Sequence, residues 1–140
     1  MIQQRIVIFT VLVCMLAGCG QVFKRHEHQK MKEMELDKIS NKTARAAIAA
    51  WQTGDSAQWL TFFTEQARLL DDGHPRDFKK FSTEAIGTER FTSIDKVEEE
   101  GTAIYGQFHS DTWGDFKTYF KFKINADGKI EQLEIGQADY

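Results

Sequence analysis

The sequence predicts an α+β fold in which three N-terminal helices pack on one face of a curved antiparallel sheet. Helix signals are confined to 40–86, where alanine-rich runs, capping residues and apolar residues at helical spacing occur. Strand signals follow from 90 onward, with alternating apolar residues between turns. Helices grouped before strands, instead of alternating with them, are typical of α+β domains.

The helices are marked by their ends. The first covers 40–51, where alanines dominate, and Gly54 ends it. Asp55 caps the second helix, whose apolar face starts at Trp59. The third spans 77–86. Each apolar face needs a partner layer, which the strands supply.

Strands are expected at 67–71, 90–98, 103–110, 116–124 and 129–135. The clearest is 116–124, because large apolar and polar residues alternate along it. One face holds residues expected to be buried, namely Phe116, Phe120, Phe122 and Ile124. The other face holds lysines expected to be exposed, namely Lys117, Lys121 and Lys123. Turns are expected at 72–75, 99–102 and 125–128, so consecutive strands run antiparallel.

The N-terminus reads as an export signal. A polar head containing Arg5 precedes an apolar run over 6–16, which is too short to span a bilayer comfortably. The run ends in Leu16-Ala17-Gly18-Cys19, which resembles the bacterial lipobox. That resemblance implies that 1–18 is a cleaved signal peptide and that Cys19 carries the lipid. The alternative is an ordinary secretory signal with an accidental cysteine.

A lipidated Cys19 would place the chain at a membrane. Several acyl chains make a stable anchor, whereas a single chain binds only marginally. Gly20, in place of an aspartate, implies sorting to the outer membrane, facing the periplasm, if the host is Gram-negative. Residues 19–39 then form a polar tether and 40–140 form the folded domain.

Composition excludes several function classes. The net charge of −3 gives no basis for a nucleic-acid partner. The other cysteine, Cys14, lies in the predicted signal, so the domain has no disulfide and no thiolate ligand. We therefore expect no metal and no other cofactor.

Four motifs in order resemble the nuclear transport factor 2-like superfamily, in its SnoaL-like and ketosteroid-isomerase-like branch. They are Trp51-x-x-Gly54-Asp55, Trp59-x-x-Phe62-Phe63, Ala67-Arg68-Leu69-Leu70-Asp71-Asp72-Gly73 and Phe120-x-Phe122-x-Ile124-x-x-Asp127-Gly128-Lys129-Ile130. The resemblance implies a sheet wrapped around its helices into a cone-shaped barrel with an apolar pocket at the open end. Relatives often form homodimers through the convex face of the sheet. A homodimer is one alternative here, although lysines on that face disfavour a dry interface.

The resemblance places Asp71 at the general-base position of ketosteroid isomerases. The matching oxyanion-donor positions hold Ala47 and Phe120, which cannot donate to an enolate, so steroid isomerase activity is excluded. The favoured alternative is that Asp71 and Asp72 belong to a polar turn before Gly73. His109 is the second catalytic candidate, with Asp111 nearby, but the strand alternation turns it away from the core. The predicted pocket residues are Trp51, Trp59, Phe63, Leu69, Asp71, Phe91, Phe108, Trp113 and Phe120.

Three functions are compatible with these features. We expect the domain to bind an apolar small molecule, or a partner protein of the envelope, without catalysis. One alternative is a lyase or isomerase using Asp71 as general base. The other is a purely structural interaction module with no usable cavity.

Overall fold

A computed structural model describes residues 35–140 and confirms the α+β class. The predicted signal peptide, Cys19 and most of the predicted tether lie outside the described residues. The helices are α2 (Lys42–Thr53), α3 (Ser56–Thr61) and α4 (Phe78–Ala85). The strands are β1 (Phe63–Asp71), β2 (His74–Arg76), β3 (Glu89–Glu98), β4 (Ala103–Ser110), β5 (Gly114–Ile124) and β6 (Ile130–Gln137). A short 3₁₀ turn, η1 (Glu99–Gly101), joins β3 to β4.

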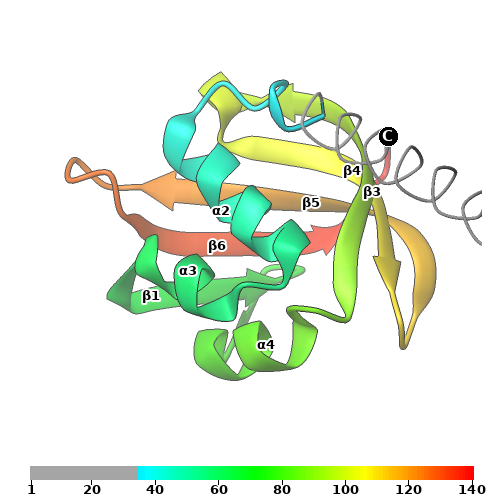
Figure 1. The fold of residues 1–140 in the computed structure, drawn as a ribbon, viewed down its shortest axis with the longest axis horizontal. Helices are drawn as coiled ribbons and strands as arrows, with labels where there is room; N and C mark the ends of the chain where they lie inside the picture. The colour runs from blue at the N-terminus through cyan, green and yellow to red at the C-terminus, as the bar shows by residue number, and fades with distance from the viewer. Residues whose placement is uncertain (1–34) are drawn as a thin grey trace, which may run out of the picture. The chain divides into compact units, whose positions relative to one another are not determined.

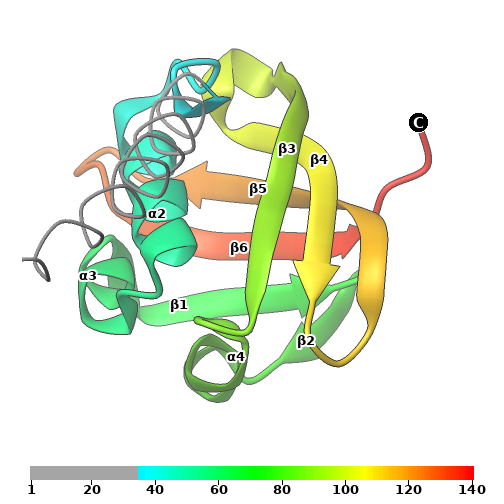
Figure 2. The ribbon, with the colours of Figure 1, turned by 45° about the vertical axis from the view of Figure 1, so that its right-hand side comes forward.

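The described strands form one curved sheet in the order β2-β1-β6-β5-β4-β3. Figure 1 shows α2 lying across β5 and β6, and Figure 2 shows β3 and β4 bending away from their direction. One pair departs from the predicted antiparallel pattern, because β1 and β6 run parallel. No hairpin joins these two strands, since the rest of the domain separates them in sequence, so no tight turn dictates their direction.

The β1–β2 hairpin also differs from the expected turn at 72–75. Asp72 and Gly73 have φ angles of 47° and 80°, which a two-residue type I′ turn requires at both positions. Asp71 therefore pairs directly with His74, and β2 adds an edge strand to the sheet. The strand before the turn begins at Phe63, four residues earlier than its alternation suggested.

Predicted caps fix the helices. Gly54 ends α2 in the left-handed conformation, and the Asp55 carboxylate accepts from the Gln58 backbone N–H at 2.9 Å. Helix α2 starts slightly later than predicted, because Asn41 is its cap and accepts from the Ala44 N–H at 3.0 Å.

The core is a layer of aromatic rings between α2 and the sheet. Trp51 sits at its centre, with ring centroids 5.0 Å from Trp59, 5.6 Å from Phe81 and 5.2 Å from Phe120. On β5, Phe120 and Phe122 are buried as predicted, whereas Phe116 and Ile124 are half-buried near the strand ends. Lys117 and Lys123 are exposed, and Lys121 is half-buried beside the rings of Tyr105 and Tyr119.

Residues 35–39, predicted to end the tether, pack against the domain. The Glu35 carboxylate accepts from the Ile94 N–H at 2.6 Å, and the Lys38 ammonium donates to the Ile94 carbonyl at 2.7 Å. Ile39 is fully buried. Ile94 borders an irregularity in the β3–β4 register, where its backbone groups need partners outside the sheet. The packed part of the chain therefore includes this segment.

Candidate functional site

A cavity of about 510 Å³ opens between α4, the β1–β2 hairpin and the β4–β5 hairpin. Its walls include apolar side chains, namely Phe81, Ala85, Phe108, Phe116, Phe120 and Ile135. The volume lies in the range of small-molecule sites, which are mostly apolar with a few polar groups that orient the ligand. Strands β3 and β4 bend away from the direction of β1 and β6 (Figure 2), and residues of these four strands and of α4 line the cavity.

Charged groups of both signs surround this cavity. The acidic ones are Asp71, Asp72, Glu84 and Glu89, and Arg76 is basic. Arg76 lies opposite Leu69 in the β1–β2 pairing, which turns it inward, and its guanidinium sits 5.0 Å from the Phe81 ring centroid. Its Nη1 atom lies 2.7 Å from Oδ2 of Asp71. The carboxylate at the predicted general-base position is thus already paired with a cation.

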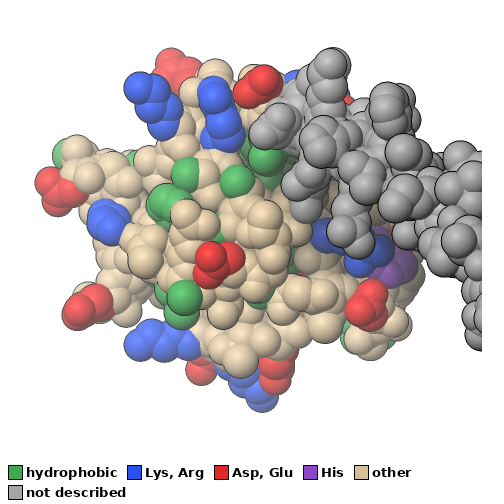
Figure 3. Space-filling model, viewed as in Figure 1, with side chains coloured by type: hydrophobic (Ala, Val, Ile, Leu, Met, Phe, Trp, Pro, Cys, Tyr) green, Lys and Arg blue, Asp and Glu red, His purple; other side chains and the backbone are tan. Residues whose placement is uncertain are grey.

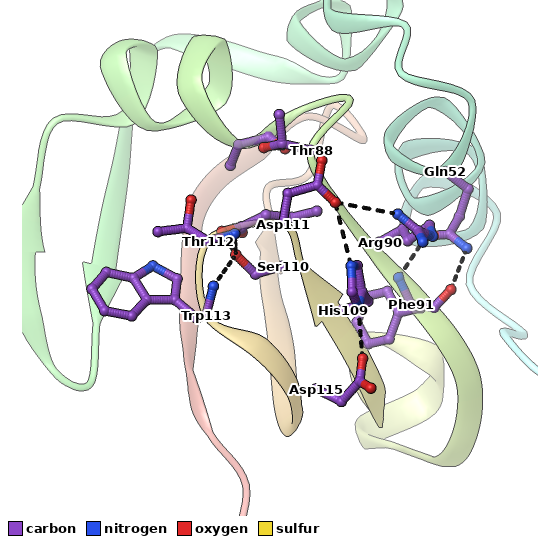
Figure 4. A network of polar contacts seen from close by, with 12 residues as sticks. Gln52, Thr88, Arg90, Phe91, His109, Ser110, Asp111, Thr112, Trp113 and Asp115 are labelled. Atoms are coloured by element: carbon purple, nitrogen blue, oxygen red, sulfur yellow. Dashed lines mark hydrogen bonds and ion pairs between the residues drawn. The ribbon is translucent and has the colours of Figure 1, made fainter.

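Glu89 is the second inward-facing carboxylate and pairs across the sheet with Ser110. The buried Ser110 hydroxyl donates to Oε1 of Glu89 at 3.0 Å. The Oγ atom of Ser110 also accepts from the backbone N–H groups of Thr112 and Trp113, each at 3.3 Å (Figure 4). One serine therefore connects an acid in the cavity to the loop at its mouth. Burial raises the pKa of Glu89, while the Ser110 hydroxyl and the charge of Arg76 act in the opposite direction.

Trp113 lies at the mouth of the cavity, in the turn between β4 and β5. Its side chain is 78% exposed, whereas Trp51 and Trp59 are buried in the core. A large apolar ring exposed to water is unfavourable and adds nothing to the core. The position of the Trp113 ring beside an aromatic cavity therefore favours a role in binding.

His109 lies on the outer face of β4, away from the cavity. Its Nδ1 is 2.6 Å from Oδ1 of Asp115, and its Nε2 is 3.3 Å from Oδ1 of Asp111 (Figure 4). Asp111 also lies 3.9 Å from Arg90. This cluster fastens the start of the β4–β5 hairpin to β3. Both ring nitrogens face carboxylates, and His109 is not one of the residues that line the cavity.

The predicted pocket residues divide into two layers. Asp71, Phe108, Trp113 and Phe120 line the cavity. The others pack in the core beneath it, namely Trp51, Trp59, Phe63, Leu69 and Phe91. Strand alternation identifies the residues that face inward. Residues of both layers face inward, so alternation alone does not separate cavity-lining residues from core residues.

Sequence reasoning missed Glu89 and Arg76. The signal for Glu89 was available, because extending the alternation of the buried Phe91 back by two residues places Glu89 on the inner face. Arg76 was not predicted because a turn was expected at 72–75, so no strand alternation indicated which way its side chain points. Gln52 fixes the backbone next to Glu89, since its amide both donates to and accepts from Phe91, at 2.9 and 2.8 Å (Figure 4).

Glu89→Gln should stabilise the protein at neutral pH. A raised pKa means that the folded protein holds the Glu89 proton more tightly than the unfolded chain. The stability of the wild type therefore falls as pH rises from the ordinary glutamate range through the raised value. Glutamine keeps the acceptor for Ser110 and removes the ionisation, so its melting temperature should exceed that of the wild type at neutral pH.

The gap between the two melting temperatures should close at acidic pH, where Glu89 is protonated in both states. Thermal unfolding followed by circular dichroism over a pH series measures it. A variant less stable than the wild type at neutral pH would show that Arg76 outweighs the burial of the charge.

A membrane-spanning helix and a cluster of metal ligands are both absent from the part of the chain that the structure describes. None of its helices has the length and apolar character needed to cross a membrane. Among residues 35–140, no three histidine, cysteine or acidic side chains come together as metal ligands. Charges of both signs are interspersed on the face that carries α2 and α3, without a block of one sign (Figure 3).

Comparison with known proteins identifies the fold. No family model matches the chain, and no curated protein matches it. Among solved structures it is similar to an NTF2-like protein of unknown function from Cytophaga hutchinsonii, with a TM-score of 0.59, 11% identity, and coverage of 71% of this chain and 89% of that one. The domain has the nuclear transport factor 2-like fold.

Two further solved structures are similar to this chain in fold. A putative ketosteroid isomerase from Kribbella flavida aligns with a TM-score of 0.57 and 11% identity, over 72% of this chain and 78% of that one. The Orange Carotenoid Protein of Anabaena (Nostoc) sp. PCC 7120, solved binding canthaxanthin, aligns with a TM-score of 0.56 and 17% identity. That match covers 69% of this chain and 35% of that longer one. At these identities the likeness defines the fold, and function must be argued from the site.

Proposed function

We propose that this protein is a lipid-anchored envelope protein whose nuclear transport factor 2-like domain binds an amphipathic small molecule without transforming it. The observation that carries the proposal is the cavity of about 510 Å³, with aromatic walls and a charged mouth. Such a combination can hold an apolar body and orient one polar end. The similarity to part of the Orange Carotenoid Protein, a structure solved binding canthaxanthin, supports a small-molecule ligand.

The groups around Asp71 are unsuited to turnover of an enolate. The two positions that would hold oxyanion donors carry Ala47 and Phe120, both buried and without a donor group. Stabilisation of an oxyanion is usually the largest contribution to enolate chemistry. The Asp71 carboxylate is held by Arg76 at 2.7 Å, which favours its ionised, paired form over a role as proton acceptor from a substrate.

The N-terminal leader is the feature that supports a lipid anchor. Leu16-Ala17-Gly18-Cys19 precedes a polar segment and then the packed domain, an order suited to a body held near a lipid surface. In a Gram-negative host, Gly20 favours the outer membrane, with the domain in the periplasm. A second copy of the chain could associate through the outer sheet face. There Lys96 lies 4.4 Å from the Tyr105 ring and Lys117 lies 4.6 Å from the Tyr140 ring, so such a contact would be polar.

Native mass spectrometry of the mature chain in lipid nanodiscs tests the proposal. A non-covalent small molecule should remain bound to the wild type. Ala85→Leu, which enlarges a side chain in the cavity wall, should lower its occupancy while the far-ultraviolet circular dichroism stays unchanged. Equal occupancy in both proteins would place the molecule elsewhere. Wild type that carries none, and takes up none from a cell extract, would favour the purely structural module.

Asp71→Asn distinguishes binding from catalysis. The substitution weakens the partly exposed pair with Arg76, and such pairs contribute roughly 0–1 kcal/mol. Ligand affinity should therefore change by less than about tenfold, and no reaction should disappear. The measurement is ligand affinity alongside assays for isomerase and dehydratase turnover. Turnover in the wild type that vanishes in Asp71→Asn would establish the alternative of a lyase or isomerase using Asp71, for which the nearby Glu89 is the observation in favour.

A further inference from the structure

The charges around the cavity do not balance. Asp71 and Arg76 neutralise each other across 2.7 Å. Glu84 has a cation within 4.0 Å, since Lys80 lies one turn before it on α4. Asp72 and Glu89 have no ion-pair partner within 4.0 Å among the described residues. The cavity mouth therefore carries an excess of negative charge.

We infer that the ligand of this cavity is a cationic amphiphile, with an aromatic or aliphatic body against the phenylalanine walls and an ammonium group beside Glu89. This inference rests on the proposed binding function and specifies its ligand class. An opposite charge lowers the cost of holding an ionised carboxylate at a half-buried position. Ser110 fixes Oε1 of Glu89 at 3.0 Å, so the carboxylate is oriented before the ligand arrives.

Aromatic rings next to Glu89 strengthen this preference. Phe108 and Phe116 line the cavity, with ring centroids 5.6 Å apart, and Trp113 stands at its mouth. A cation over an aromatic face is attracted by the ring quadrupole, most strongly by tryptophan. The backbone N–H of Trp113 and the Glu89 carboxylate share the Ser110 hydroxyl, so the backbone that carries the indole is connected to the acid.

An anionic ligand is disfavoured by the same geometry. Arg76 is the one basic residue in the lining and could attract a carboxylate. Its Nη1 is engaged by Asp71, and Glu89 is near enough for Arg76 to affect its titration. An incoming anion would compete with one carboxylate and be repelled by others.

Three dansyl probes with the same ring and the same pentyl chain test the charge preference. Dansylcadaverine ends in an ammonium group, N-pentyl dansylamide ends in a methyl group, and the dansyl-aminohexanoate probe ends in a carboxylate. Each is titrated into the full mature chain in nanodiscs, with empty nanodiscs as blank, and dansyl emission is recorded. The ammonium probe should bind roughly fivefold tighter than the neutral one, and the carboxylate probe should bind weakest.

Glu89→Gln should reduce the affinity for the ammonium probe by roughly fivefold and leave the neutral probe unchanged, because glutamine keeps the bond from Ser110. Glu98→Gln is the matched control, since Glu98 lies at the other end of β3 and outside the cavity lining. Equal binding of ammonium and neutral probes, or a preference that survives Glu89→Gln, would overturn the inference while leaving the cavity a binding site. Failure of all three probes to bind would instead count against the binding function itself.

Discussion

Phe120→Ala should lower the free energy of unfolding by about 3–5 kcal/mol. Only 1% of the residue is exposed, and its ring lies 5.2 Å from Trp51, 5.1 Å from Phe91 and 5.6 Å from Phe108 between centroids. Truncating the ring removes contacts to helix α2 and to strands β3 and β4 at the same time. The space left lies beside the cavity, where few side chains can move inward to fill it.

Urea unfolding at equilibrium measures this loss. Phe116→Ala is the matched control, because Phe116 is on the same strand face but is half-buried at the cavity wall. Its loss should be clearly smaller, since its ring is already partly exposed before truncation. A loss below ~1 kcal/mol for Phe120→Ala would mean that this ring does not hold the core together.

Cys19→Ser should release the protein from membranes. The lipid attaches to the cysteine thiol in the lipobox interpretation, and serine offers no such attachment. Because membrane affinity comes almost wholly from acyl chains, at ~0.8 kcal/mol per buried CH₂, the variant should move from the detergent phase to the aqueous phase. Phase partitioning and mass spectrometry of the mature N-terminus measure it.

Cys14→Ser provides the control, since that cysteine lies within the predicted signal and is absent after cleavage. It should partition like the wild type. An unmodified Cys19 in the mature wild type, with the signal removed at another position, would contradict the anchor.

Local signals predicted most of the fold. Each of these signals acts over a few residues, so it can be read directly from the sequence. Examples are the helix end at Gly54, the cap at Asp55 and the alternation along β5. The parallel pairing of β1 with β6 depends on how distant segments pack, and no local pattern encodes it. The short strand β2 was not predicted, because Pro75 suggests a turn. Strand β2 lies at the edge of the sheet, where proline is tolerated.

The site was less predictable than the fold. The family resemblance placed Asp71 among the predicted pocket residues, and Asp71 does line the cavity. Its partner Arg76 reaches it only because the β1–β2 hairpin forms. The hydrogen bonds from Glu89 through Ser110 to Trp113 connect the start of β3 to the end of β4 and the loop that follows it. Contacts of this kind arise from register and curvature, which composition and periodicity do not specify.

The place of β6 in the sheet has a consequence for the order of folding. This strand is the last in the sequence, yet it lies between β1 and β5, so it joins the β1–β2 hairpin to the β5-β4-β3 half. Until residues 130–137 have been synthesised, the two halves of the sheet cannot pair through β6. Long-range pairing of this type folds slowly, so the aromatic residues of the core stay exposed for longer in a newly made chain.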